Sequence, residues 1–217
     1  MTLWNSLRDK CLQQSDTVSL GEYSSSALRT DPKHLLFSLS RYKAAAKMLP
    51  LEKGATLEMG CGDGLGALIL KQFSSSVLAV DGDSRAIQSA EAMNIPDITF
   101  LCDDFLGKKY GRFAAVVSLD VIEHIHSHLE DRFFSAISDN LDDDGVCIIG
   151  TPNSTAEQYT YDSNLESHVN LYNAERLYAT LKTRFHNVFL FGMNDEVLHT
   201  GFYPMCHYLI AAACNKK

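Results

Sequence analysis

The sequence predicts an α/β fold in which helices cover both faces of a doubly wound, mostly parallel sheet. From about residue 53, short apolar runs typical of buried strands alternate with segments whose apolar residues recur at helical spacing. A glycine cluster, "GCGDGLG" at 60–66, directly follows the first of these runs. The chain has 217 residues, 46% of them hydrophobic, which is enough for one such domain and a small extension.

The alternation allows the elements to be placed in order. Strands are expected at 55–59, 76–81, 98–103, 113–120, 145–151, 187–192 and 206–213. Helices are expected at 65–73, 84–93, 131–141 and 173–185. In the third helix Phe133, Phe134 and Ile137 recur at helical spacing, and Asn173 is a suitable N-cap for the fourth. Strands and helices in this order predict a mostly parallel, seven-stranded sheet.

The first 52 residues stand apart from this alternation. Asp31 is a suitable N-cap, and Pro32 a suitable first residue, for a helix that ends before Pro50. We expect residues 1–52 to form a helical extension, or lid, over the ligand-binding end of the sheet, and residues 53–217 to form the main domain. A helix that merely covers an edge of the sheet is the alternative.

The amino-acid composition indicates which kinds of partner the protein can bind and in which cellular compartment it is expected. The formal net charge is -8 and the isoelectric point about 5.4, which argues against a broad basic face for nucleic acid. The N-terminus is too polar for a signal peptide, and no apolar run is long enough for a membrane span. The six cysteines form no CxxC pair, so a reducing cytoplasm is the expected setting. Oligomeric state cannot be predicted from these features.

A strand, a glycine-rich turn and a helix N-terminus together form a cofactor cradle. The helix N-terminus offers unpaired N–H groups, and open α/β sheets bind ligands beyond the carboxyl ends of their strands. A dinucleotide would require the pattern G-x-G-x-x-G/A, which fits "GDGLGA" from Gly62. That register leaves Glu58 and Gly60 unexplained, but it keeps a nicotinamide-dependent oxidoreductase open as an alternative.

A second cofactor class fits the same stretch. The run "LEMGCGDG" resembles motif I of the class I S-adenosylmethionine-dependent methyltransferases, in which an acid stands two residues before G-x-G-x-G. The resemblance continues in order through "VLAVDGD", "FLCDDF" and "VVSLDVIEHI" at the ends of the next three strands. It implies a Rossmann-like fold and S-adenosylmethionine as cofactor. The cofactor-binding residues would be Arg41, Glu58, Gly60, Cys61, Gly62, Asp81, Gly82, Asp103, Asp104 and Leu119.

Each of these residues has an implied partner on the cofactor. In such families the acid at the position of Asp81 accepts hydrogen bonds from the ribose hydroxyls, and the acid at Asp103 meets the adenine amino group. Arg41 lies near the spacing at which the ubiquinone-type enzymes place an arginine on the cofactor carboxylate. Glu58 would favour the cationic side of the methionine moiety.

The run "LDVIEHIHSH" narrows the resemblance further. It is similar to the D/E-x-x-E-H run of the ubiquinone-biosynthesis O-methyltransferases and their small-molecule relatives, in which these residues are associated with a divalent metal. Carried over, the metal ligands would be Asp120, Glu123 and His124, and Mg²⁺ or another divalent ion would lower the pKa of an acceptor hydroxyl. Alternatively His124 acts as a general base without metal.

The acceptor site is expected in the variable C-terminal part. His168, followed by Tyr172, resembles a stretch that lines the substrate cavity in related enzymes, and a second loop carries His199 and His207. The segment after the fifth strand leaves the sheet at the edge that also carries the glycine turn. We therefore expect His168 and His124 to be catalytic and to share one cavity.

These features predict a methyltransferase that acts on an oxygen of a small molecule or glycan-like metabolite. The alternatives are N-methylation of a small molecule or RNA, a nicotinamide-dependent oxidoreductase, and a cofactor-binding scaffold that activates a partner chain.

Overall fold

A computed structural model describes residues 2–13, 18–50, 52, 54–159 and 166–217. The strands are β1 Ala55–Met59, β2 Ser76–Asp81, β3 Ile98–Cys102, β4 Phe113–Leu119, β5 Leu141–Pro152, β6 Phe185–Asn194, β7 Val197–His199 and β8 Tyr208–Lys216. The α-helices are α1 Leu3–Gln13, α2 Glu22–Thr30, α3 Pro32–Lys47, α4 Leu65–Lys71, α5 Ser84–Ala92, α6 Glu130–Asn140 and α8 Ala174–Lys182. Short 3₁₀ helices are η1 Ile122–His124, η2 Ser127–Leu129, η3 Ser154–Tyr159 and η4 Tyr203–Met205.

The strands form one sheet in the order β3-β2-β1-β4-β5-β8-β6-β7. Strands β1 to β5 pair in parallel, whereas β8, β6 and β7 join by antiparallel pairing. The predicted α/β fold is confirmed, but the sheet has eight strands rather than seven. The additional strand, β7, is three residues long and pairs only with Gly192–Asn194, next to a turn in which Asp195 has a φ of 49°. A strand of three residues is too short to show the alternation of apolar and polar side chains by which strands are predicted.

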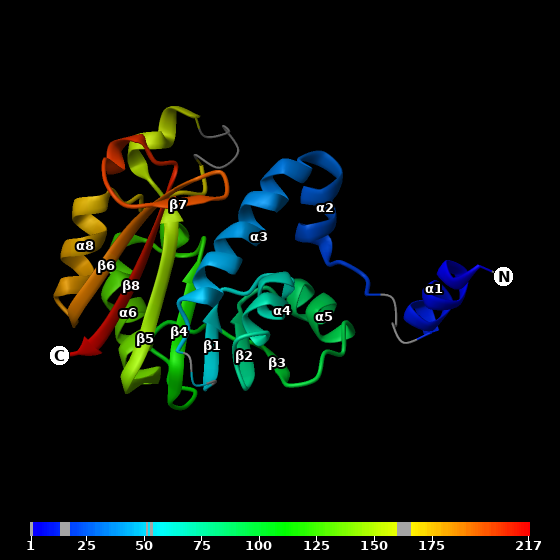
Figure 1. Ribbon diagram of the computed structural model, residues 1–217. Coiled ribbons are helices and arrows are strands. Elements are labelled where there is room, and N and C mark those ends of the chain that lie inside the picture. Colours follow the sequence, from blue (N-terminus) through cyan, green and yellow to red (C-terminus); the bar gives the residue numbers. More distant parts are fainter. Residues whose placement is uncertain (1, 14–17, 51, 53, 160–165) are drawn as a thin grey trace.

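Helices cover both faces of the sheet, as Figure 1 shows. On one face, α6 and α8 bury Phe133, Ile137 and Leu177 against the strands. On the other face, α3, α4 and α5 bury apolar residues that include Ala46 and Leu70. This two-sided cover explains why the parallel strands read as nearly continuous apolar runs.

The predicted helix after Asp31 is present as α3, and its first turn has the expected chemistry. The Asp31 side chain accepts a hydrogen bond from the His34 amide at 3.1 Å, and Pro32 occupies the first helical position. Further along, Ala45 and Ala46 are fully buried in the core. Whether residues 1–52 form a unit separate from the rest stays a prediction.

The first helix, α1, stands apart from the sheet and the other helices in Figure 1. Its apolar side chains are largely in solvent, since Leu3 is 78%, Trp4 71% and Leu7 48% exposed. Among the described residues, no helix combines the length and the hydropathy that crossing a membrane requires.

Candidate active site

The glycine cluster forms the turn between β1 and α4. Gly60 and Gly62 have φ angles of 83° and 52°, which residues with side chains rarely adopt. At Gly60 a Cβ atom would also lie 2.2 Å from Cγ2 of Val121. The amides of Gly60 and Cys61 donate to the Val80 carbonyl at 2.8 and 3.2 Å, which fixes the turn against β2. The result is a cradle of bare backbone at the carboxyl end of β1.

Glu58 lies just before this turn and is only 1% exposed. Neither of its carboxylate oxygens meets the geometry of a hydrogen bond within the described residues. Burial, reinforced by the charge of Asp81, raises the pKa of Glu58 to about 8, although the nearby Tyr42 hydroxyl partly opposes the shift. A buried carboxyl whose described interaction is with the Tyr42 hydroxyl alone is costly to the fold. Its two oxygens are therefore suited to receive a ligand with N–H groups.

Asp81 ties the end of β2 to the glycine turn. Its Oδ2 accepts a hydrogen bond from the Gly62 amide at 2.7 Å, and its Oδ1 accepts one from the Asp83 amide at 2.9 Å. Both oxygens are thus oriented by backbone groups, but each keeps a lone pair for another donor.

Asp103 directly follows β3 and is held by two side chains. Its carboxylate pairs with the Lys108 ammonium and accepts a hydrogen bond from the Tyr110 hydroxyl at 3.0 Å. The Lys108 bond, more than the Tyr110 bond, holds the pKa of Asp103 below its ordinary value. The neighbouring Asp104 accepts from the Leu106 amide at 3.0 Å. The acids that follow β3 are therefore ordered by the loop that carries them.

Asp120 follows β4 in a left-handed conformation, with a φ of 57°. Its amide donates to the Gly150 carbonyl at 3.0 Å, so the strained backbone is held by β5. Its Oδ1 lies 2.9 Å from Nη1 of Arg41, and that guanidinium stacks over the Tyr208 ring at 3.9 Å from the ring centroid. Two residues with separate predicted roles, cofactor binding for Arg41 and metal binding for Asp120, thus form an ion pair.

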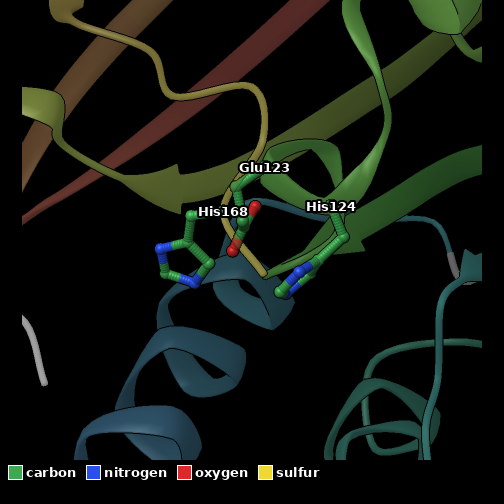
Figure 2. A group of neighbouring side chains, drawn as sticks. All are labelled: Glu123, His124 and His168. Carbon is green, nitrogen blue, oxygen red and sulfur yellow. The ribbon is translucent and has the colours of Figure 1, made fainter. Parts of the chain in front are cut away.

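Three side chains converge just past Asp120, and Figure 2 shows Glu123, His124 and His168 pointing toward one another. One possible ligand atom from each lies within 4.8 Å of the other two. Glu123 is 1% exposed and accepts a hydrogen bond from the Thr151 hydroxyl at 3.0 Å. Burial, followed by the charge of Asp120, raises the pKa of Glu123, whereas burial and the neighbouring His124 lower the pKa of His168.

The segment that carries His168 is fastened to η1. Nδ1 of His124 lies 3.0 Å from the Ser167 carbonyl, and the Asn170 amide donates to the Glu123 carbonyl at 3.0 Å. Because a carbonyl only accepts, Nδ1 of His124 must carry a proton, and in the neutral imidazole Nε2 then carries the lone pair. These backbone contacts fix the two histidines relative to each other, with ring centroids 5.1 Å apart.

A polar network centred on Glu130 holds the same segment from the other side. Oε2 of Glu130, the first residue of α6, accepts from Nη2 of Arg176 at 2.6 Å, from Nδ2 of Asn170 at 3.3 Å and from the Tyr172 hydroxyl. The Arg176 guanidinium also lies over the Tyr172 ring, 4.0 Å from its centroid. Tyr172 is fully buried in this network, so it supports the loop rather than lining a cavity.

Three cavities formed by the described residues meet at Asp120. The turn cavity, of about 280 Å³, lies between α2, α3 and the glycine turn. The acid cavity, of about 580 Å³, lies between that turn and the ends of β2 and β3. The histidine cavity, of about 590 Å³, is lined by α3, η1 and later loops. Asp120 lines all three, so a ligand that fills the first two ends where the third begins.

Most predicted site residues line one of these cavities. The turn cavity has Gly60, Cys61, Gly62 and Leu119, and the acid cavity has Gly60, Gly62, Asp81, Gly82, Asp103 and Asp104. The histidine cavity has Arg41, Glu123, His124, His168 and His207, so the two predicted catalytic histidines share one cavity. His199 lies elsewhere, with its Nε2 buried beside Gly192. The roles of all these residues stay predictions.

The sequence reasoning missed the contribution of α2, which lies over the glycine turn. Oδ2 of Asp63 accepts from the Ser24 amide and Oδ1 from the Ser24 hydroxyl, both at 2.7 Å. The Tyr23 hydroxyl donates to Asp83 at 2.5 Å, and Tyr23 lines both the turn cavity and the acid cavity. These partners are 39 and 60 positions apart in sequence, so no local pattern could reveal them.

Comparison with known proteins adds a family match to this geometry. Residues 34–184 match a family model described as a methyltransferase domain. Similar curated proteins include the ubiquinone biosynthesis O-methyltransferases of Pelagibacter ubique, 24% identical over 55% of this chain and 51% of that protein, and of Brucella ovis, 28% identical over 51% and 46%. The chain thus spans about half the length of the curated relatives it matches.

Solved structures show the same fold. A DhpI complex with S-adenosylhomocysteine superposes with a TM-score of 0.65 and 16% identity, covering 89% of this chain and 90% of that one. The N-methyltransferase NodS from Bradyrhizobium japonicum, also in complex with S-adenosylhomocysteine, has a TM-score of 0.61 and 17% identity, covering 87% and 90%. At these identities the likeness establishes architecture alone, and it confirms the Rossmann-like fold.

Proposed function

The chain belongs to the methyltransferase-domain family, and from that membership we propose that it transfers the methyl group of S-adenosylmethionine to an oxygen of a polar small molecule or glycan-like metabolite. The observation that carries the proposal is the position of Asp120, where the turn, acid and histidine cavities meet. A two-part cofactor can fill the first two cavities while an acceptor enters the third. The chain would then supply mainly alignment of the reacting atoms.

The turn cavity fits the methionine end of this cofactor, together with Arg41, which lines the histidine cavity, and Glu58, which is buried and lines none of the three cavities. The Glu58 carboxylate, which interacts with the Tyr42 hydroxyl, has further lone pairs that suit an ammonium group, and Gly60 and Gly62 leave the backbone open to close approach. Arg41 uses one nitrogen on Asp120, and its remaining N–H groups can bind a carboxylate. When bound, S-adenosylmethionine would supply an electrophilic methyl group on a positively charged sulfur. Cys61 and Leu119 would complete the wall around it.

The acid cavity suits the adenosine end. Asp81 and Asp103 are hydrogen-bond acceptors at the ends of adjacent strands, which matches the ribose hydroxyls and the adenine amino group. Gly82 and Asp104 lie beside them in the same cavity. A nicotinamide cofactor is less well supported. An oxidoreductase would need residues for hydride transfer, and the Tyr-x-x-x-Lys pair that could serve, Tyr178 and Lys182, lies on α8 and lines none of the three cavities.

His168 and His124 would accept the proton that the acceptor hydroxyl releases during methyl transfer. Burial lowers the pKa of His168, so its imidazole is neutral near pH 7 and can accept a proton from a hydroxyl. His124 is oriented by the Ser167 carbonyl, which leaves its Nε2 as a second acceptor.

The lining of the histidine cavity favours a hydrophilic acceptor. Of its 14 residues only Phe37, Pro152 and Ala156 are apolar, while four of the chain's eight histidines lie there. Such a wall suits hydroxyl groups and charges better than a long apolar tail. Oxygen is the proposed acceptor atom because the curated relatives are named O-methyltransferases, and nitrogen is the alternative because NodS is named an N-methyltransferase.

A divalent metal at the acceptor is the second version of the proposal. Glu123, His124 and His168 present one carboxylate and two imidazoles, a donor set that suits Mn²⁺ or Zn²⁺ better than Mg²⁺. The Ser167 carbonyl orients His124 as an outer partner of a metal ligand would. Asp120, the third residue of the set that the resemblance implies, is paired with Arg41, so we propose His168 as the third ligand in this version.

Ligand binding tests the cofactor assignment. Calorimetric titration with S-adenosylhomocysteine should show saturable binding, while NADH and NADPH should show none. Labelled S-adenosylmethionine and a panel of catechols, sugars and amines, read by mass spectrometry, then distinguish oxygen from nitrogen acceptors. Binding of a nicotinamide dinucleotide alone would sink the proposal.

Titration with Mn²⁺, followed by its electron paramagnetic resonance signal, separates the two versions of the acceptor site. A metal held by this set should be lost in Glu123→Gln and retained in His126→Ala, which alters an exposed histidine outside the cavity. If activity with the identified acceptor survives EDTA undiminished, His168 and His124 act as bases without metal.

The proposed function also includes catalysis by this chain itself, a separate N-terminal extension and a cytoplasmic setting. A histidine cavity of about 590 Å³ provides room for an acceptor, which supports an enzyme over a cofactor-binding scaffold. We also propose that residues 1–52 act as a separate extension and that the chain works in the cytoplasm, where its free thiols at Cys61, Cys147 and Cys206 would stay reduced.

A further inference from the structure

The helix α2 lies outside the matched residues 34–184, yet it forms a wall of both cavities assigned to the cofactor. We propose that Tyr23 is a cofactor-contact residue of this protein and that the bond between Ser24 and Asp63 positions it. The inference rests on the proposed function, because it takes S-adenosylmethionine as the ligand of the two cavities.

The first step is how α2 is fastened to the glycine turn. Its N-cap residue, Gly21, has no side chain to satisfy the first amides of the helix. Asp63 provides that acceptor from the turn itself, since it binds the amide and the hydroxyl of Ser24 at 2.7 Å each. Asp63 and Ser24 are each only 6% exposed. The start of α2 is thus capped by the same loop that forms the cradle.

The fit at this junction is close. A Cβ atom at Gly21 would lie 2.4 Å from Cβ of Asp63, so the backbone of α2 rests directly on the turn. Tyr23 follows Gly21, the N-cap residue of the same helix, by two positions. The contact between Gly21 and Asp63 therefore fixes the position of the Tyr23 side chain.

The second step is where Tyr23 stands. Its ring lies 3.5 Å from the position of a Cβ atom built on Gly62, and its hydroxyl donates to Asp83. The Asp83 amide in turn donates to Asp81, the acid assigned to the ribose. Tyr23 is nevertheless 55% exposed, because its ring borders two open cavities. An aromatic ring half in solvent where two ligand cavities join is suited to cover a ligand.

The chemistry of the ligand agrees with this position. The turn and acid cavities share Tyr23, Gly60, Gly62 and Asp120, so a ligand spanning both must pass the tyrosine ring. The group that joins the methionine and adenosine ends of the proposed cofactor is a cationic sulfur next to a ribose. Aromatic faces attract cations and pack on sugar rings.

Calorimetry with S-adenosylhomocysteine as probe tests the proposal without knowledge of the acceptor. The sulfur of this probe is an uncharged thioether, so the experiment measures packing of the ring on the ligand and not its attraction to a cation. Tyr23→Ala should weaken binding about tenfold, because it removes the ring, and Tyr23→Phe only about twofold, because it keeps the ring. Ser24→Ala should weaken binding as well, since it loosens α2. The matched control is Tyr178→Ala, another half-exposed tyrosine, which lines a groove on α8 and should bind the probe as the parent chain does.

A conservative substitution at Asp63 distinguishes loss of the α2 position from general destabilisation of the protein. Asp63→Ala should weaken the binding of S-adenosylhomocysteine, whereas Asp63→Asn should restore most of it. An asparagine can accept from the Ser24 amide and donate to the Ser24 hydroxyl, so both bonds persist without the charge. Hydrogen exchange in residues 22–30 of the parent chain should slow when the probe is added.

The binding results distinguish the role of Tyr23 from the identity of the cofactor. If the parent chain binds S-adenosylhomocysteine but Tyr23→Ala binds it equally well, or if exchange in α2 is unchanged by the probe, Tyr23 is not a contact residue. If the parent chain does not bind the probe at all, the proposed cofactor is wrong and this inference is overturned with it.

Discussion

At the scale of single residues, Glu58 is a group of the candidate site that lowers the free energy of unfolding. Burial raises its pKa from an ordinary value of 4.5 to about 8, so the folded protein keeps a proton that the unfolded chain releases. A carboxyl with a raised folded-state pKa makes the free energy of unfolding fall as pH rises from about 4.5 to about 8. The buried carboxyl thus lowers the stability of the fold as pH rises, which agrees with its proposed role as a ligand-binding group.

Glu58→Gln should therefore be more stable than the parent chain at pH 8 and similar to it at pH 4.5. Melting temperatures measured across this range by calorimetry would show the parent losing stability with rising pH while the variant changes less. The variant should also bind S-adenosylhomocysteine about tenfold more weakly, because an amide lacks the charge that holds an ammonium. Parallel pH curves for the two proteins would show that Glu58 does not titrate in this range.

His168 is the residue on which turnover should depend most. His168→Ala should lower turnover about 100-fold with the acceptor identified from the panel, and it should leave the affinity for S-adenosylhomocysteine nearly unchanged. The control is His126→Ala, which removes an exposed histidine that stacks on His128 outside the histidine cavity. Full turnover in the His168 variant would leave His124 as the candidate base.

Individual site residues could be predicted to different extents. Glu58, Asp81 and Asp103 could be found because each stands at a fixed offset from a strand end, and parallel strands bring those ends to one edge. The pairing of Arg41 with Asp120 could not, because it joins residues 79 positions apart through the packing of α3.

At the scale of elements, the loop with His168 owes its position to the first turns of two helices. Glu130 opens α6 and Arg176 lies in the first turn of α8, and their ion pair encloses Asn170 and Tyr172. An acid at a helix N-terminus also interacts favourably with the helix dipole. The loop is therefore coupled to the packing of both helices.

Glu130→Gln should release this loop. An amide cannot accept from three donors at once, so the free energy of unfolding should fall by about 1–3 kcal/mol, as measured by urea denaturation. Hydrogen exchange should accelerate in residues 167–172, and turnover should fall while the affinity for S-adenosylhomocysteine stays the same. Glu91→Gln, at an exposed position on α5, is the matched control. Unchanged exchange in the loop would show that Glu130 does not hold it.

Elements with strong apolar patterns were predicted well, and the errors have physical causes. The strands at Ala55–Met59 and Ser76–Asp81 have the bounds expected from sequence. The fifth strand begins at Leu141, four residues before the expected start at 145. Asp142 and Asp143 are tolerated in that strand because Arg112 pairs with both. Charge compensation by Arg112, which is 30 and 31 positions away in sequence, is invisible in a local window.

At the scale of the whole molecule, one edge of the sheet collects the candidate site. The carboxyl ends of five parallel strands meet there, and α2 and α3 close over them (Figure 1). Residues from Tyr23 to His207 thus line adjoining cavities although they span most of the chain. The topology explains why the sequence, read strand by strand, predicts a candidate site at this edge and a helix after Asp31, but not the contacts that α2 makes with the glycine turn.

The isolation of α1 has a consequence for spectroscopy. Trp4 is the single tryptophan of the chain, and it stands in solvent on a helix that lies apart from the sheet. Tryptophan emission should therefore resemble that of a free indole in water, and it should not follow the cooperative transition that far-ultraviolet circular dichroism records in denaturant. Coincident transitions by the two probes would mean that α1 packs on the domain in solution. A dye-free fluorescence assay of folding would need a new tryptophan at a buried position, for instance Phe185→Trp on β6.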